Sequence, residues 1–173
     1  RAQYFYSFVL TWIIGGTFLA LLFSSAGPCF FEAVTYKSTY APLMNYLRTA
    51  AVDYHVPAVK IQEHLWNKYQ DSAITLGGGI SAMPSIHVAT AFLFMMIGWS
   101  RNKIIGCLFT AFYVLIVIGS VHLGWHYAID AYAGTVIALL MWGFSEKLVM
   151  AQNRLWDSAH NIIRTDTEDN QAD

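Results

Sequence analysis

The chain has 173 residues, of which 56% are hydrophobic and 12% are charged, and its formal net charge is −1. Soluble domains carry about 25% charged residues, so half of the usual charge is missing, and the mean hydropathy is +0.42. This composition excludes a disordered chain and most soluble enzymes. The small net charge offers no patch for DNA or RNA, so we expect no nucleic-acid partner. We expect the chain to lie in a lipid bilayer.

Four apolar stretches follow one another along the chain, and about 20 apolar residues are needed to cross the hydrocarbon core of a bilayer. Because no ten-residue alternation of polar and apolar residues repeats, these stretches predict helices rather than the strands of a membrane barrel. The expected spans are residues 4–26, 82–100, 104–122 and 127–148. The sequence therefore predicts an all-α integral membrane bundle that occupies residues 1–150.

Two polar segments lie outside these spans. Residues 27–81 form a loop with a balanced set of charges, in which Pro57–Tyr69 has the apolar spacing of a short amphipathic helix. Such a helix lies on the membrane surface. Residues 151–173 form a polar tail, and we expect its mostly acidic end, residues 165–173, to be without regular structure.

Basic residues predict the orientation of the chain, because short cytoplasmic loops are enriched in Lys and Arg. These residues are Arg1, Arg101, Lys103, Lys147 and Arg154. The rule places residues 27–81 and 122–126 together on the extracytoplasmic or luminal face of a multi-pass protein, and the tail in the cytoplasm. It also places Cys29 and Cys107 on opposite sides, so we expect no disulfide between them.

Polar residues gather at the outer starts of the second and fourth spans. Asp130 is the one acid inside an expected span other than Glu146, which lies close to the end of the fourth span. An ionisable residue at that depth is a functional candidate. His126 lies four residues before it, on the same face of a helix. A carboxylate there can accept one imidazole N–H, fix the tautomer and leave the other nitrogen free to attack.

A second group of polar residues starts the second span at the same depth. His87 can donate a proton to a leaving oxygen, and Ser85 with free backbone N–H groups can bind phosphate oxygens. Each of these residues alone is more often structural, as an interhelical tie for example. Together with His126 and Asp130 they predict a site for stepwise phosphoryl transfer.

At these residues the sequence resembles the type 2 phosphatidic acid phosphatase superfamily, over about residues 79–140. Pro84-Ser85-Ile86-His87 is similar to its P-S-x-H motif, and His126-Tyr127-Ala128-Ile129-Asp130 to its H-x-x-x-D motif. The resemblance implies that His126 is the nucleophile, Asp130 its orienting group, His87 the general acid and Ser85 a phosphate ligand. It also implies six spans, two of them upstream of this chain, and catalysis without a metal or other cofactor.

The sequence departs from the superfamily pattern at its phosphate-binding cations. A lysine followed six residues later by Arg-Pro is absent, and Ser120 stands where an arginine is expected before the nucleophile. These losses and the H-Y-x-x-D form resemble the branch of inositol phosphorylceramide and sphingomyelin synthases, which transfer a phosphorylated head group between lipids. The remaining candidates for binding the substrate phosphate are Arg48, Lys60, Lys68 and His122.

Alternative functions remain open at this stage. The chain would bind a phospholipid or lipid phosphate, and the acceptor would be a lipid or polyol in a transferase, or water in a lipid phosphate or polyprenyl diphosphate phosphatase. A haem or metal carrier would use His87, His122 and His126. His122 and His126 also form an H-x-x-x-H pair that could hold a metal with Asp130 as a third ligand, although the resemblance implies no metal. A scaffold without activity is the last alternative.

Overall fold

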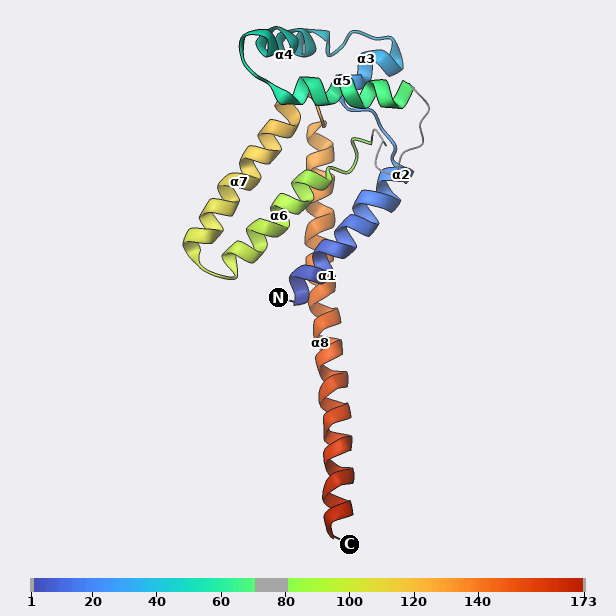
Figure 1. Cartoon of the computed structure of the whole chain (residues 1–173), viewed down its shortest axis with the longest axis vertical. Coiled ribbons are helices and arrows are strands. Elements are labelled where there is room, and N and C mark those ends of the chain that lie inside the picture. The colour runs from blue at the N-terminus through green and yellow to red at the C-terminus, as the bar shows by residue number, and fades with distance from the viewer. Residues whose placement is uncertain (1, 71–80, 173) are drawn as a thin grey trace.

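The structure is a computed structural model that describes residues 2–70 and 81–172, so residues 71–80 of the expected loop lie outside it. The described residues form helices and no strand, which confirms the all-α fold class. In chain order the helices are α1 (Ala2–Leu10), η1 (Thr11–Leu19), α2 (Ala20–Leu22), α3 (Pro28–Thr35), α4 (Ala41–Asp53), α5 (Pro57–Gln70), α6 (Ile86–Trp99), α7 (Lys103–His122) and α8 (Ala128–Ala172) (Figure 1).

Three of the four expected spans are helices long and apolar enough to cross a membrane: Ala2–Leu22, Lys103–His122 and Ala128–Ser158. The helix of the remaining span, α6, has 14 residues, which at 1.5 Å per residue gives about 21 Å. It begins at Ile86, not at residue 82, because Pro84 precedes it and Ser85 caps it. A residue before proline is disfavoured in the helical conformation, and residues 81–85 are a non-helical segment that leads into α6.

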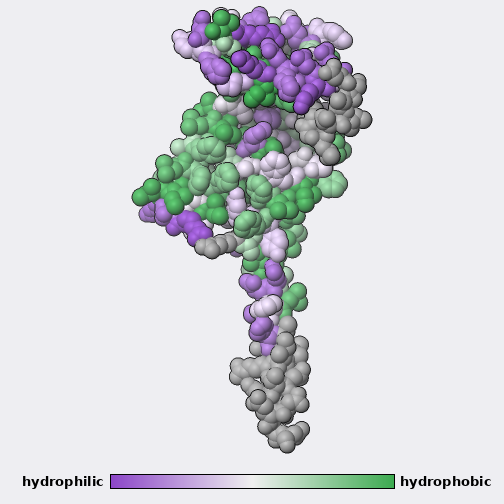
Figure 2. Space-filling model, in the orientation of Figure 1, coloured by the Kyte–Doolittle hydropathy of each residue, from purple (hydrophilic) through white to green (hydrophobic). Residues whose placement is uncertain are grey.

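The four membrane helices form one bundle in which α6 packs against α7 and α8, and α1 packs against α8. Its core contains Ala89, Phe92 and Leu93 of α6 and Ala138 of α8. Figure 2 shows hydrophobic residues covering the outside of the bundle. This exposed apolar surface is what a helix bundle presents to lipid.

Helices α3, α4 and α5 lie across one end of the bundle, and we call them the surface layer (Figure 1). Met44, Leu47 and Val59 form its small core. Hydrophilic residues cover much of this layer (Figure 2). The helix expected at Pro57–Tyr69 is present as α5, and the expected loop therefore consists largely of short helices.

Two hydrogen bonds attach the surface layer to the turn between α7 and α8. The backbone N–H of Cys29 donates to the Gly124 carbonyl (2.9 Å), and Nε2 of Gln62 donates to the Leu123 carbonyl (2.8 Å). The layer is thus fixed directly above the turn that leads into α8.

The opposite end of the bundle carries the turn between α6 and α7 and the start of α1 (Figure 1). Helix α8 extends well beyond this end, and it continues to Ala172. The sequence led us to expect no regular structure at residues 165–173, and the structure instead continues the helix through most of that segment. No proline or glycine interrupts the helix in this segment.

Candidate active site

The two motifs meet where the start of α6 crosses the start of α8. The backbone N–H of Ser85 donates to the Asp130 carbonyl at 3.1 Å. Gly134 makes this approach possible, because a Cβ at that position would collide with the Ser85 carbonyl oxygen. The side chain of Ser85 is fully buried, and its Oγ accepts from the Val88 N–H at 3.5 Å as the N-cap of α6.

His126 lies in the turn between α7 and α8 and is 8% exposed. Its Nδ1 is 2.6 Å from the carbonyl oxygen of Ala82, in the non-helical segment that leads into α6. A carbonyl oxygen only accepts, so this hydrogen bond requires the proton on Nδ1. The Nε2 atom then carries the lone pair, which is the state needed for a nucleophile or a base.

Asp130 is 1% exposed and lies in the first turn of α8. Its Oδ2 accepts from the Tyr127 N–H at 2.8 Å and is 3.9 Å from Nδ1 of His126. The hydrogen bond that we expected between imidazole and carboxylate is therefore replaced by the bond to Ala82. Asp130 caps its own helix and places a carboxylate next to the imidazole.

His87 occupies the first turn of α6 and is exposed. Its ring centroid lies 6.2 Å from that of His126, with the ring planes inclined at 54°. The two imidazoles are thus neighbours at the end of the bundle, one hydrogen-bonded to the backbone and the other exposed to solvent.

The pKa of His126 is lowered from its usual value of 6.5, mainly because burial disfavours the imidazolium. The hydrogen bond to the Ala82 carbonyl acts in the opposite direction, and the nearby His87 lowers the pKa further. His126 therefore stays neutral, with Nε2 unprotonated, to a lower pH than a solvated histidine.

The expected phosphate-binding residues take three different positions. Lys60 is exposed on α5, while Arg48 on α4 lines a cavity within the surface layer. His122 is exposed at the end of α7, with its ring 6.3 Å from that of Tyr46. Ser120, at the position of the expected arginine, holds the turn: its carbonyl accepts from the backbone N–H groups of Trp125 and His126, each at 3.1 Å.

A metal site needs several ligands at one point. Over residues 2–70 and 81–160 no group of three His, Cys, Asp or Glu side chains is arranged to hold a metal ion. His122 and His126 belong to different elements, one ending α7 and the other lying in the turn, so their spacing of four residues is not a helical pair.

Sequence reasoning missed two contributors to this region. The partner of His126 is a backbone carbonyl, and since every residue has one, no residue type could signal it. Gln62 was missed because a glutamine in an amphipathic helix is usually solvated; its burial follows from the contact between α5 and the turn at Leu123.

The comparisons with known proteins give one match. The sequence matches the family model described as the PAP2 superfamily over residues 1–144. No curated protein and no solved structure matches the chain.

Proposed function

Because the chain belongs to the PAP2 superfamily, a group of membrane phosphatases and phosphotransferases, we propose that it is a lipid phosphotransferase. It would move a phosphorylated head group from one lipid to a hydroxyl of another through a phosphohistidine, as an inositol phosphorylceramide synthase does. The observation that carries the proposal is the pair of imidazoles: His126 with Nδ1 held by Ala82 and its ring 6.2 Å from that of His87.

In the first half of the reaction, the Nε2 lone pair of His126 attacks the phosphorus of the donor phospholipid. The bond between phosphorus and the glycerol oxygen breaks, and protonated His87 gives its proton to that oxygen, which releases diacylglycerol. The carboxylate of Asp130, 3.9 Å from Nδ1, stabilises the positive charge that the ring gains.

In the second half, His87 accepts the proton of the acceptor hydroxyl as its oxygen attacks the phosphorus, and the bond between phosphorus and Nε2 breaks. The N-terminus of α6, which the buried Ser85 caps, is assigned to the phosphate oxygens. A phosphodiester carries a single negative charge, so it requires less cationic binding than a phosphomonoester. This fits the absence of the two arginine positions described above.

Product analysis on the purified full chain tests this proposal. A phospholipid labelled in its head group is supplied with and without ceramide as the lipid acceptor, and the products are separated. We expect the label to appear on the acceptor. His126→Ala should abolish this product, whereas His55→Ala, which removes an exposed histidine between α4 and α5, should retain it.

Other products would change the conclusion. Release of the phosphorylated head group at the same rate with and without acceptor would make water the acceptor and the chain a phospholipid hydrolase, and release of inorganic phosphate from a lipid phosphate would make it a phosphatase. Full activity of His126→Ala, with helical content equal to wild type by circular dichroism, would overturn the nucleophile assignment.

A further inference from the structure

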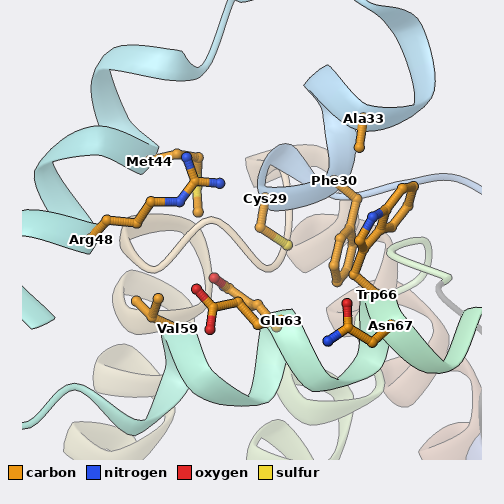
Figure 3. Close-up of a pocket in the computed structure, with 10 residues that line it drawn as sticks. Cys29, Phe30, Ala33, Met44, Arg48, Val59, Glu63, Trp66 and Asn67 are labelled. Carbon is orange, nitrogen blue, oxygen red and sulfur yellow. The ribbon is translucent and has the colours of Figure 1, made fainter. Parts of the chain in front are cut away.

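The surface layer forms an open cavity of about 330 Å³, which we call the layer cavity (Figure 3). All three helices of the layer line it, and it is separate from the pair of imidazoles. Ligand pockets have volumes of about 300–1,000 Å³, so this one matches a ligand the size of a lipid head group. Its lining residues are Cys29, Phe30, Ala33, Met44, Arg48, Val59, Gln62, Glu63, Trp66 and Asn67.

Gln62 is the first indication that the layer cavity binds a ligand. The residue is 4% exposed, and its Nε2 is used by the Leu123 carbonyl. Its Oε1 is buried and has no hydrogen-bond partner within the described residues. Buried polar atoms are nearly always paired, because an unpaired one costs free energy. A ligand with an N–H or O–H donor in the cavity would supply the missing partner.

The charges of the cavity point to a ligand with both signs. Arg48 extends from α4 and Glu63 from α5 on opposite sides of the cavity (Figure 3). No ion pair joins them in the part of the chain that the structure describes. A cation alone would be repelled by the guanidinium and an anion alone by the carboxylate. A zwitterion satisfies both, with its anionic group at Arg48 and its cationic group at Glu63.

The side of α5 favours a primary ammonium as the cationic group. Two acceptors lie there, the buried Oε1 of Gln62 and the exposed carboxylate of Glu63, and a primary ammonium can donate N–H groups to both. The aromatic wall is beside them: the rings of Phe30 and Trp66 stack at 5.7 Å with 20° between their planes. An ammonium near an aromatic face gains a cation–π interaction.

We propose that the layer cavity binds a zwitterionic aminoalkyl phosphate. The phosphate accepts hydrogen bonds from Arg48, and the primary ammonium donates to Oε1 of Gln62 and to Glu63. A quaternary ammonium has no N–H to donate, so the site discriminates against it. The ligand is either the head group of a phospholipid or the free aminoalkyl phosphate, and the experiment below separates these sources.

A neighbouring cavity and one aromatic contact lead from the layer cavity toward the turn that contains His126. A second cavity of about 240 Å³ shares Cys29, Ala33, Met44 and Arg48 with it and extends to Tyr40. The ring of Tyr40 lies 5.7 Å from that of Tyr127, the residue after His126. Ligand binding in the layer cavity does not involve a chemical reaction. An effect of that binding on lipid turnover rests on the function proposed above.

Two binding measurements on the full chain carrying His126→Ala test the proposal, with wild type alongside. The first titrates soluble phosphoethanolamine, phosphocholine and glycerol phosphate by calorimetry. The second compares the thermal unfolding midpoint in nanodiscs that contain either phosphatidylethanolamine or phosphatidylcholine. Each is repeated with Glu63→Gln, Arg48→Gln and the control Asp53→Asn, which removes an exposed charge of α4 outside both cavities.

We expect phosphoethanolamine or its lipid to bind in preference to the choline and glycerol compounds. The two cavity substitutions should weaken that binding about tenfold or more, since each removes a charged hydrogen-bonding partner, and Asp53→Asn should not. If only the ethanolamine lipid shows the preference, the ligand is a membrane phospholipid. If soluble phosphoethanolamine binds as well, the free phosphate ester is also a ligand.

The proposal is overturned by equal binding of the ethanolamine and choline compounds, by binding that survives both cavity substitutions, or by no binding in either measurement. If the proposed lipid phosphotransferase function is wrong, while the binding proposal is right, the measurements give a different result. It would leave wild type without turnover of any lipid, while the ethanolamine preference and its loss in Glu63→Gln persist.

Discussion

His126 and Asp130 illustrate how a membrane site fixes an imidazole without a direct carboxylate hydrogen bond. The Ala82 carbonyl holds Nδ1 at 2.6 Å, and Asp130 lies 3.9 Å away, with its Oδ2 bonded to the Tyr127 N–H. A backbone carbonyl is positioned by the fold and is not removed by substituting the residue that supplies it. The carboxylate contributes its charge and the geometry of the turn.

The lowered pKa of His126 leads to a prediction about pH. Attack needs the neutral ring, and burial keeps the ring neutral below the usual pKa of 6.5. The acid side of the pH profile for the first half-reaction, measured as the initial burst of released diacylglycerol, should therefore have its midpoint below pH 6.5. A phosphodiester donor is the appropriate substrate, since it does not titrate in this range. A midpoint at or above 6.5 would contradict the assignment.

At the scale of elements, the contact between α6 and α8 determines whether the two motifs meet. The backbone of Gly134 lies against the Ser85 carbonyl, where a Cβ would be 3.2 Å from the carbonyl carbon as well. The same crossing carries the hydrogen bond from the Ser85 N–H to the Asp130 carbonyl. A small residue at this position lets the two backbones approach, as in many membrane helix pairs.

Gly134→Ala should therefore lower stability by about 1–3 kcal/mol through overpacking and reduce activity, because α8 must shift away from α6. Gly143→Ala is a matched control in the same helix: apart from the neighbouring residues and the backbone of its own helical turn, no described atom lies within 4 Å of a Cβ placed there. The control should be neutral or more stable by up to about 1 kcal/mol, since alanine is the better helix former. Thermal unfolding in detergent and product formation measure the two effects. Equal stability of the two variants would refute the close contact.

At the scale of the whole molecule, the surface layer and the turn between α6 and α7 lie at opposite ends of the bundle (Figure 1). The imidazole pair lies at the end that the surface layer covers, next to the turn to which Cys29 and Gln62 attach it. The distribution of basic residues predicts that this end is extracytoplasmic or luminal.

Cysteine labelling in sealed, oriented vesicles tests that orientation. Cys107 is replaced by alanine, whereas Cys29 can stay, because burial raises the pKa of its thiol to about 12 and keeps it unreactive at pH 8. A membrane-impermeant maleimide should label Ser38→Cys, in the surface layer, from the extracytoplasmic side only. It should label Lys103→Cys, at the start of α7, from the cytoplasmic side only. Labelling of both from one side would contradict the topology, and the reverse pattern would invert it.

The sequence by itself determined the fold class and the family. Its long apolar stretches require helices, because backbone groups in lipid must bond within their own segment, and the motifs around His87 and His126 are local patterns. It also predicted α5 from its spacing. The start of α6 was placed four residues too early, because hydropathy does not register the effect of Pro84 and the cap at Ser85.

Only the tertiary structure decided which atoms meet. The bond from His126 to Ala82 joins residues 44 positions apart, and the burial of Gln62 depends on the docking of α5 against the turn at Leu123. Arg48 shows the same dependence: the sequence offered it as one of several cations, and the packing of three helices put it in the layer cavity opposite Glu63. Such contacts depend on the orientation of whole helices, which residue type and spacing along one helix do not specify.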